Sequence, residues 1–226
     1  VLQAAQGLPV VMGVSGYHLG QVLEQVQALA RYPAAGLLVS APHYIRPSQE
    51  GLLHWFRTLA DASKAPVLIY DIPYRTGVTI LPATLRRIVQ HPRIVAIKDC
   101  GGNPESTMAL LADGLVDVLA GEDSQIFNAL CLGASGAISA SAHIHPELFV
   151  RLYQQVEVGQ LAAARSTFFQ LLPLIQGLFV EPNPIPVKWA LAKMGKCGGT
   201  LRLPLTPLSD GAQSTVEAAL REAGVL

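Results

Sequence analysis

Residues 66–104, PVLIYDIPYRTGVTILPATLRRIVQHPRIVAIKDCGGNP, decide the fold class of this chain. The stretch holds two apolar runs of strand length, residues 66–70 and 94–98, and a helical pattern that begins at Pro82 lies between them. Neither run alternates apolar with polar side chains, which is typical of parallel strands buried on both faces. The stretch therefore predicts a strand, a helix and a second strand parallel to the first.

The same unit recurs along the chain. Further apolar runs cover residues 9–13, 36–40, 116–121 and 136–139, and helices are predicted over 19–30, 48–62, 82–89, 104–112, 124–132 and 146–157. Pro82, Pro104 and Pro146 fall in the first turn of a predicted helix, where a missing N–H leaves no hydrogen bond unmade. Beyond residue 157 only helices are predicted, over 161–178, 184–194 and 213–223.

This alternation predicts an α/β fold, either a doubly wound sheet or a (β/α)8 TIM barrel. We expect the barrel, because no GxGxxG follows a strand and polar side chains end several strands. Six units are two short of closure, and residues 1–7 resemble the end of a helix at a glycine, so we expect the first two β/α units to be missing from this chain. Residues 1–158 would then supply barrel units three to eight, and residues 159–226 a C-terminal helical extension of the same structural domain.

Composition excludes several classes of function. Half of the 226 residues are hydrophobic, and 16 basic side chains balance 16 acidic ones, which predicts one soluble globular domain with no electrostatic surface for nucleic acid or an anionic membrane. No apolar run is long enough to span a bilayer. Cys100, Cys131 and Cys197 form no CxxC pair, which favours a reducing cytoplasm over a disulfide framework or a zinc site.

Lys98 is the most informative candidate for catalysis. It ends a buried apolar strand, and in a β/α barrel the carboxyl ends of the strands carry the catalytic groups. Desolvation there favours a neutral amine, which is a nucleophile for carbonyl carbon, whereas the alternative is an ion pair with Asp99, Glu122 or Asp123. Schiff-base chemistry also needs proton transfers.

Other strand ends add candidate partners. Tyr70 ends the preceding strand and can supply a phenol, and Tyr44 is a second candidate, although each can instead be a loop anchor. Arg75 lies in the turn beyond Tyr70 and is suited to hold a carboxylate through two hydrogen bonds. Gly121 and Ile138 end strands where backbone carbonyls can face a ligand.

Two further features carry less weight. His143 and His145 resemble half of a metal site but have no obvious third ligand, so metal catalysis ranks below lysine catalysis. Cys100 has no histidine nearby in sequence that would mark a thiolate partner, so we interpret it as a small loop or packing residue.

Taken in order, these motifs resemble the dihydrodipicolinate synthases of the pyruvate-dependent class I aldolase superfamily. The resemblance rests on PHY at 42–44 with RPSQEG at 46–51, YDIP at 70–73 with RTG at 75–77, IKD at 97–99 and VEPNPIPVK at 180–188. It implies that Lys98 forms a Schiff base with pyruvate. The enamine would then attack aspartate semialdehyde, giving 4-hydroxy-tetrahydrodipicolinate for lysine and diaminopimelate biosynthesis with no organic cofactor or metal.

The resemblance also assigns roles to the other candidates. It implies that Tyr70 is the proton donor and acceptor beside Lys98, and that Tyr44 reaches across a dimer contact into the neighbouring subunit's site. Arg75 falls at the carboxylate-binding position of the entrance, and Ile138 at a main-chain position that contacts pyruvate. A homo-oligomer is implied, commonly a dimer of dimers, that is, a homotetramer.

Three departures from the family pattern lead to expectations of their own. The Gly-Thr-Thr segment that binds the pyruvate carboxylate is absent from these 226 residues, so we expect this polypeptide alone to be inactive or unfolded. Asp71 stands where the family usually carries asparagine, and we expect it to point away from the pocket. The lysine-binding positions of regulated relatives align with Tyr17, Gln21 and His43, which lack the usual glutamate and predict weak or absent feedback inhibition.

Two other functions stay open at this point. N-acetylneuraminate lyase and keto-deoxy sugar acid aldolases share the Lys98 and Tyr70 chemistry, but a rim arginine at Arg75 favours a second substrate with its own small charged end. A catalytically silent homologue, serving as a binding or assembly subunit, is the alternative from another class. The joint presence of Lys98, Tyr70, Tyr44 and Arg75 argues against it.

Overall fold

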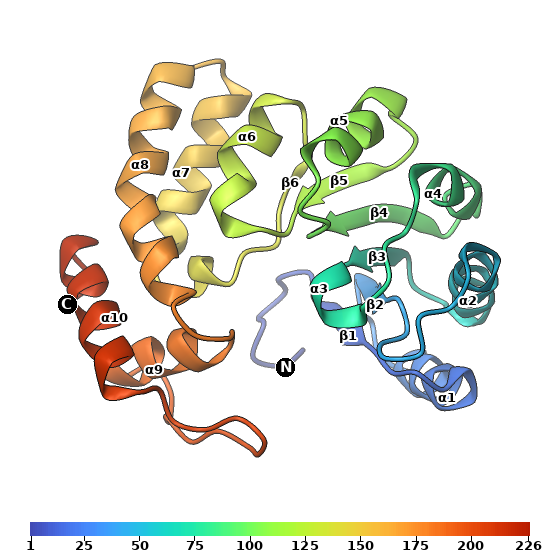
Figure 1. The fold of residues 1–226 in the computed structure, drawn as a ribbon, viewed down its shortest axis with the longest axis horizontal. Coiled ribbons are helices and arrows are strands. Elements are labelled where there is room, and N and C mark those ends of the chain that lie inside the picture. Colours follow the sequence, from blue (N-terminus) through green and yellow to red (C-terminus); the bar gives the residue numbers. More distant parts are fainter. The chain divides into compact units, whose positions relative to one another are not determined.

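A computed structural model describes all residues of the chain, Val1–Leu226, which form two compact units, Val1–Leu119 and Ala120–Leu226. Strands alternate with helices in the first unit, and helices make up most of the second (Figure 1). No helix is both long enough and apolar enough to cross a bilayer.

A sheet forms the centre of the first unit. Its strands are β1 (Val11–Val14), β2 (Gly36–Ser40), β3 (Val67–Asp71), β4 (Ile94–Asp99) and β5 (Asp117–Ala120), which lie side by side in chain order; the last residue of β5 is the first of the second unit. The pairs formed by β1 to β4 are all parallel, as the apolar runs predict. The register places Tyr70 opposite Lys98, and Asp71 opposite Asp99.

Each strand of the first unit is followed by helix. The helices are α1 (Leu19–Leu29), α2 (Gln49–Ala62), α3 (Pro73–Thr76), α4 (Pro82–Ile88) and α5 (Pro104–Asp113). Ser48 caps α2 by accepting a hydrogen bond from the Gly51 amide, and Asn103 caps α5 in the same way. Pro82 and Pro104 occupy first-turn positions, as predicted. The sequence did not predict α3, because a single turn is too short to show helical periodicity.

The core of the first unit lies between the strands and α2. Phe56 of α2, Ile69 of β3 and Ile97 of β4 are fully buried. Burying each such side chain contributes roughly 1.5–3 kcal/mol. The Trp55 indole N–H donates to the carbonyl of Ser40 at 3.0 Å, so α2 is also fastened to the carboxyl end of β2, where functional groups gather.

The second unit is mainly helical. Its elements are β6 (Gly136–Ala137), the 3-10 turns η1 (Asp123–Gln125) and η2 (Ser141–His143), and the helices α6 (Ile126–Cys131), α7 (Pro146–Glu157), α8 (Leu161–Leu178), α9 (Ile185–Lys193) and α10 (Asp210–Glu222). The Ile138 amide, directly after β6, donates to the carbonyl of Ala120, the first residue of this unit, at 2.9 Å.

Helices α8 and α10 pack closely in this unit. Leu174, Leu178 and Leu220 are fully buried between them and their neighbours. A Cβ added at Gly177 would lie 2.7 Å from the Cβ of Ala219, so a glycine is needed where the two helices meet. The three C-terminal helices predicted from the sequence are therefore present and tightly packed.

Some element ends differ from the prediction. Residues 1–7 form turns rather than the end of a helix, with positive φ angles at Gln6 and Gly7. Helix α10 begins at Asp210, three residues earlier than predicted, because the Ser209 side chain caps it. Strand β6 covers only two of the four predicted residues.

Candidate active site

Lys98 and Tyr70 contact each other at the carboxyl ends of β4 and β3. They are register partners, and the Lys98 Nζ lies 4.2 Å from the centroid of the Tyr70 ring. Both side chains are half-buried. A cation over an aromatic face at this distance is electrostatically favourable, so the ring and the amine hold each other in place. The predicted nucleophile and proton donor are therefore brought together.

Lys98 is not paired with the carboxylate beside it. The Asp99 Oδ1 accepts a hydrogen bond from the Gly101 amide at 2.8 Å, and its Oδ2 accepts one from the Thr107 hydroxyl. These bonds hold the Asp99 side chain at the start of α5. The alternative interpretation of Lys98 as the partner of Asp99 finds no support in this arrangement.

The Tyr70 phenol holds its proton firmly. Burial raises the pKa of Tyr70 well above its ordinary value, and an electrostatic interaction and a hydrogen bond with the side chain of Cys100 raise it further. The side chain of Tyr74 acts in the same direction, whereas the positive charge of Arg75 opposes them. A phenol that stays protonated can donate to a hydroxyl that leaves as water.

Arg75 lies in α3, the single helical turn directly beyond β3. Its guanidinium carbon is 5.7 Å from the centroid of the Tyr74 ring, and the side chain is exposed. The turn begins at Pro73 and ends at Gly77, whose φ of 78° favours glycine. Arg75 therefore lies at the exposed rim of the strand ends that carry Tyr70 and Lys98. It is near enough to Tyr70 to influence the pKa of the phenol.

Tyr44 lies outside the contact of Lys98 and Tyr70. Its backbone amide donates to the Thr76 carbonyl at 3.3 Å, so its loop lies against the end of α3. The side chain, however, is 88% exposed, and the residue has a φ of 75°. A tyrosine this exposed can meet another molecule, and the predicted role of Tyr44 in the site of a neighbouring subunit stays a prediction.

Gly121 and Ile138 belong to the second compact unit, and both are half-buried. The backbone amide of Ile138 is used in pairing with Ala120. Their contacts with a substrate stay predictions.

Tyr17 and His43 also lie together. Their ring centroids are 5.6 Å apart in an edge-to-face arrangement, and both side chains are exposed. Gln21 lies in α1, one turn beyond Tyr17, and its backbone amide donates to the Nδ1 of His18. The three residues predicted to form a degenerate lysine site therefore occupy one surface region.

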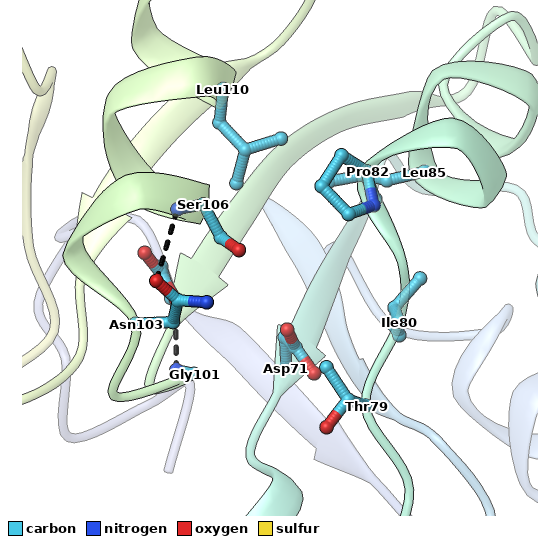
Figure 2. A pocket seen from close by; sticks show the side chains of 10 residues that line it. Asp71, Thr79, Ile80, Pro82, Leu85, Gly101, Asn103, Ser106 and Leu110 are labelled. Carbon is cyan, nitrogen blue, oxygen red and sulfur yellow. Dashed lines mark hydrogen bonds between the residues drawn. The ribbon is translucent and has the colours of Figure 1, made fainter.

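A pocket on the other face of the strand ends has no counterpart among the features predicted from the sequence (Figure 2). Its lining comes from β3, β4, α4, α5 and the loops that join them: Asp71, Thr79, Ile80, Pro82, Leu85, Asp99, Gly101, Asn103, Ser106 and Leu110. Neither Lys98 nor Tyr70 lines it, because successive side chains of a strand point to opposite faces. Asp71 therefore points away from the reactive pair, as expected from its departure from the family pattern.

Asp71 is an unusual carboxyl in this pocket. It is only 8% exposed, and its Oδ1 has no hydrogen-bond partner. Burial, together with the negative charge of Asp99, raises the pKa of Asp71 to about 7, although a hydrogen bond from the Ile80 backbone opposes the shift. Asp71 is therefore a carboxyl that titrates near neutral pH.

The two candidate metal ligands, His143 and His145, each lie within hydrogen-bond distance of a residue close by in the chain. The His143 Nδ1 lies 3.0 Å from the Ala140 carbonyl, and the His145 Nδ1 lies 3.2 Å from the Glu147 carboxylate. The structure brings together no group of three or more histidine, cysteine, aspartate or glutamate side chains that could hold a metal ion.

Comparison with known proteins points to one family. The model of the dihydrodipicolinate synthetase family matches residues 1–223. The chain is 37% identical to the 4-hydroxy-tetrahydrodipicolinate synthase of Pelobacter propionicus and 39% identical to that of Methylibium petroleiphilum. Both matches cover 100% of this chain, and they cover 79% and 78% of those relatives, respectively.

Solved structures agree with these sequences. The dihydrodipicolinate synthase of Thermotoga maritima superposes with a TM-score of 0.95 at 33% identity, covering 100% of this chain and 79% of that one. The chloride-inhibited enzyme of Acinetobacter baumannii, solved in complex with pyruvate, gives a TM-score of 0.96 at 32% identity, covering 100% and 78%. At these identities the likeness extends beyond the fold.

Proposed function

Because the chain belongs to the dihydrodipicolinate synthetase family, we propose that it condenses pyruvate with aspartate semialdehyde to give 4-hydroxy-tetrahydrodipicolinate. It is then a lyase of lysine and diaminopimelate biosynthesis that works through a Schiff base. The observation that carries this proposal is the contact of Lys98 with Tyr70, 4.2 Å from amine to ring centroid, at adjoining strand ends. Nucleophile and proton donor are the two groups that such a reaction requires.

The chemistry follows from these two groups. The Lys98 amine, once it has given up its proton, attacks the ketone carbon of pyruvate, and the new C–N bond gives a carbinolamine as the ketone oxygen takes up a proton. This intermediate loses its hydroxyl as water once a proton is supplied, leaving a protonated imine. Loss of a proton from the methyl carbon gives the neutral enamine. The enamine carbon attacks the aldehyde and forms the new C–C bond, the aldehyde oxygen takes up a proton, and the protonated imine is restored.

Tyr70 is the donor and acceptor for these protons in our proposal. Its raised pKa means that the phenol begins each cycle protonated, so it can give a proton to the departing hydroxyl. The phenolate formed in that step is a strong base and recovers a proton from the methyl group. No net charge is left on the protein at the end of the sequence.

The remaining candidates position the substrates. Arg75 would hold the carboxylate of the aldehyde, and its exposed guanidinium supports this role. Ile138 and Gly121 would contact pyruvate through the main chain. Tyr44 would act in the site of a neighbouring subunit, which requires a homo-oligomer, and a dimer of dimers satisfies that need.

We also propose how the chain fits its architecture and compartment. Residues 1–158 would supply six units of a (β/α)8 TIM barrel, and residues 159–226 would form its helical extension. The parallel strands in chain order, each followed by helix, support this assignment. The three cysteines form no disulfide with one another, which supports a reducing cytoplasm.

The sister aldolases are less favoured. The relatives named above are synthases, and an exposed arginine at the rim suits an aldehyde that carries its own carboxylate. A catalytically silent assembly subunit is also less favoured, because binding another chain does not require the Lys98 amine to lie against the Tyr70 ring.

Borohydride trapping tests the proposal. We expect the purified protein, treated with pyruvate and borohydride, to gain one reduced pyruvyl group, which peptide mapping places on Lys98. The Lys98→Ala variant should gain none, whereas Lys64→Ala, which removes an exposed lysine of the same unit, should label like the wild type. A folded full-length protein without an adduct would contradict the Schiff-base mechanism, whereas the 226-residue polypeptide alone is expected to be inactive and does not test it.

A further inference from the structure

Cys100 is held firmly beside the reactive pair. It follows the last residue of β4, and only 2% of it is exposed. Its backbone amide donates to the Asp71 carbonyl at 2.8 Å, one step beyond the pairing of Asp71 with Asp99. The residue therefore extends the β3–β4 pairing, and its position is fixed by the backbone rather than by a mobile loop.

The thiol is directed at Tyr70. In an extended chain, residues two apart lie on the same face, so Cys100 shares a face with Lys98 and with the register partner of Lys98, Tyr70. A hydrogen bond with the side chain of Cys100 is among the causes that raise the pKa of Tyr70, so the thiol lies within reach of the phenol. Tyr70 therefore has two neighbours. The amine of Lys98 lies over the face of its ring, and the thiol of Cys100 lies near its hydroxyl.

We propose that Cys100 is a positioning residue for the reaction, whose buried thiol holds the phenol of Tyr70 in place over the Lys98 amine. This inference rests on the function proposed above. The thiol forms no bond with substrate and transfers no proton in this role. It restricts where the phenol lies and which way its O–H points, because sulfur is both a weak donor and a weak acceptor.

Such a restraint is useful at this site. The phenol must reach the carbinolamine hydroxyl and later the methyl carbon, and a small displacement of a reacting group lowers the rate substantially. Tyr70 is only half-buried, so packing alone leaves its side chain some freedom. The other two cysteines, Cys131 and Cys197, are exposed in the second unit and serve as controls.

Two variants of Cys100 test the role. Loss of one hydrogen bond to the phenol should lower kcat of Cys100→Ala by about 3- to 10-fold, with KM for pyruvate within about 2-fold of wild type. Cys100→Ser keeps a donor and acceptor and should stay within about 2-fold of wild type. Cys131→Ala should behave as wild type.

A double variant supplies a readout that a packing defect would not move. In a Tyr70→Phe background, Cys100→Ala should cause no further loss of rate, because no phenol remains to be positioned.

The outcomes separate this inference from the function it rests on. An adduct on Lys98 in the wild type, with Cys100→Ala equal to wild type in kcat, would overturn the role of Cys100 alone. An equal loss of rate in the Tyr70→Phe background would overturn it too, because the effect would then come from packing. A wild type without any adduct would overturn the proposed function, and this role with it.

Discussion

Asp71 and Asp99 lie opposite each other in β3 and β4, one residue beyond the facing pair of Tyr70 and Lys98. The alternation of a strand sends the two pairs to opposite faces. The strand ends that carry the proposed nucleophile and its proton donor therefore also carry two carboxyls close enough for the charge of one to raise the pKa of the other. The Asp99 carboxylate accepts hydrogen bonds from Gly101 and Thr107, whereas the Asp71 Oδ1 has no hydrogen-bond partner. Asp71 is therefore the carboxyl whose ionised form is less stable.

Replacing Asp71 with asparagine should stabilise the protein above neutral pH. The pKa of Asp71 is about 7 in the folded protein against 3.8 for an ordinary aspartate. The folded state therefore binds the proton more tightly, and wild-type stability falls as the pH rises from about 4 through about 7. The full shift corresponds to roughly 4 kcal/mol as an upper limit, so we expect Asp71→Asn to gain about 1–3 kcal/mol at pH 8.

Urea unfolding at pH 5 and pH 8 would measure this difference. The variant should lose less stability than wild type between the two pH values, whereas Glu24→Gln, which neutralises an exposed carboxylate of α1, should follow wild type. If wild type and Asp71→Asn lost the same free energy of unfolding between pH 5 and pH 8, Asp71 would already be ionised at pH 5 and its pKa would not be raised.

Replacing Arg75 should weaken binding of the aldehyde and leave pyruvate unaffected. The proposed contact is a forked pair of hydrogen bonds to a carboxylate, which lysine cannot reproduce although it keeps the charge. We expect Arg75→Lys to raise KM for aspartate semialdehyde about 10-fold, while the pyruvate adduct on Lys98 forms at the wild-type rate. Arg57→Lys, which changes an arginine of α2, is the matched control. If the adduct forms more slowly in Arg75→Lys, the arginine would instead bind the carboxylate of pyruvate.

Mixing two inactive variants tests whether Tyr44 works in a neighbouring subunit. Tyr44 is 88% exposed and lies outside its own chain's reactive pair, so a shared site needs Tyr44 from one chain and Lys98 from another. We expect Tyr44→Phe and Lys98→Ala each to have low activity, and activity to reappear when the two are unfolded and refolded together. In a mixed dimer, one site would then contain both intact residues. No recovery, with mixed oligomers demonstrated by mass spectrometry, would assign Tyr44 to its own chain or to no catalytic role.

Lysine should inhibit this protein weakly or not at all. Tyr17 and His43 pack edge to face, and Gln21 lies exposed one turn beyond Tyr17, so no carboxylate from this position is available for the α-amino group of lysine. Steady-state assays should show no half-inhibition at sub-millimolar lysine. Gln21→Glu should increase sensitivity, because it supplies a negative charge, and half-inhibition of the wild type below 1 mM (about 4 kcal/mol of binding) would refute the expectation.

Local sequence predicted most of the elements of this fold. Continuous apolar runs marked the strands, and Pro82, Pro104 and Pro146 marked helix starts, because these signals depend on few neighbouring residues. The single turn α3 was missed for the same reason, since four residues between Pro73 and Thr76 carry no period. The early start of α10 depends on one cap at Ser209, which a pattern of apolar residues does not reveal.

The candidate site divides in the same way. Residue types at strand ends, together with their resemblance to a family, are enough to single out Lys98, Tyr70 and Arg75. By contrast, the sequence pattern around Cys100 indicates only a packing residue, and nothing in it indicates the pocket at Asp71. The register of β3 against β4 decides both, because it determines which side chains meet across the two strands.

What the sequence by itself determined is therefore the alternation of elements and the chemical groups at their ends, both of which follow from short-range patterns of burial and side-chain type. The tertiary structure alone decided which of those groups share a face, how far the Lys98 amine lies from the Tyr70 ring, and which carboxyl becomes the weaker acid. Distances and pKa values depend on what surrounds a group in space, and residues such as Tyr70 and Cys100, which are far apart along the chain, become neighbours only when the strands pair.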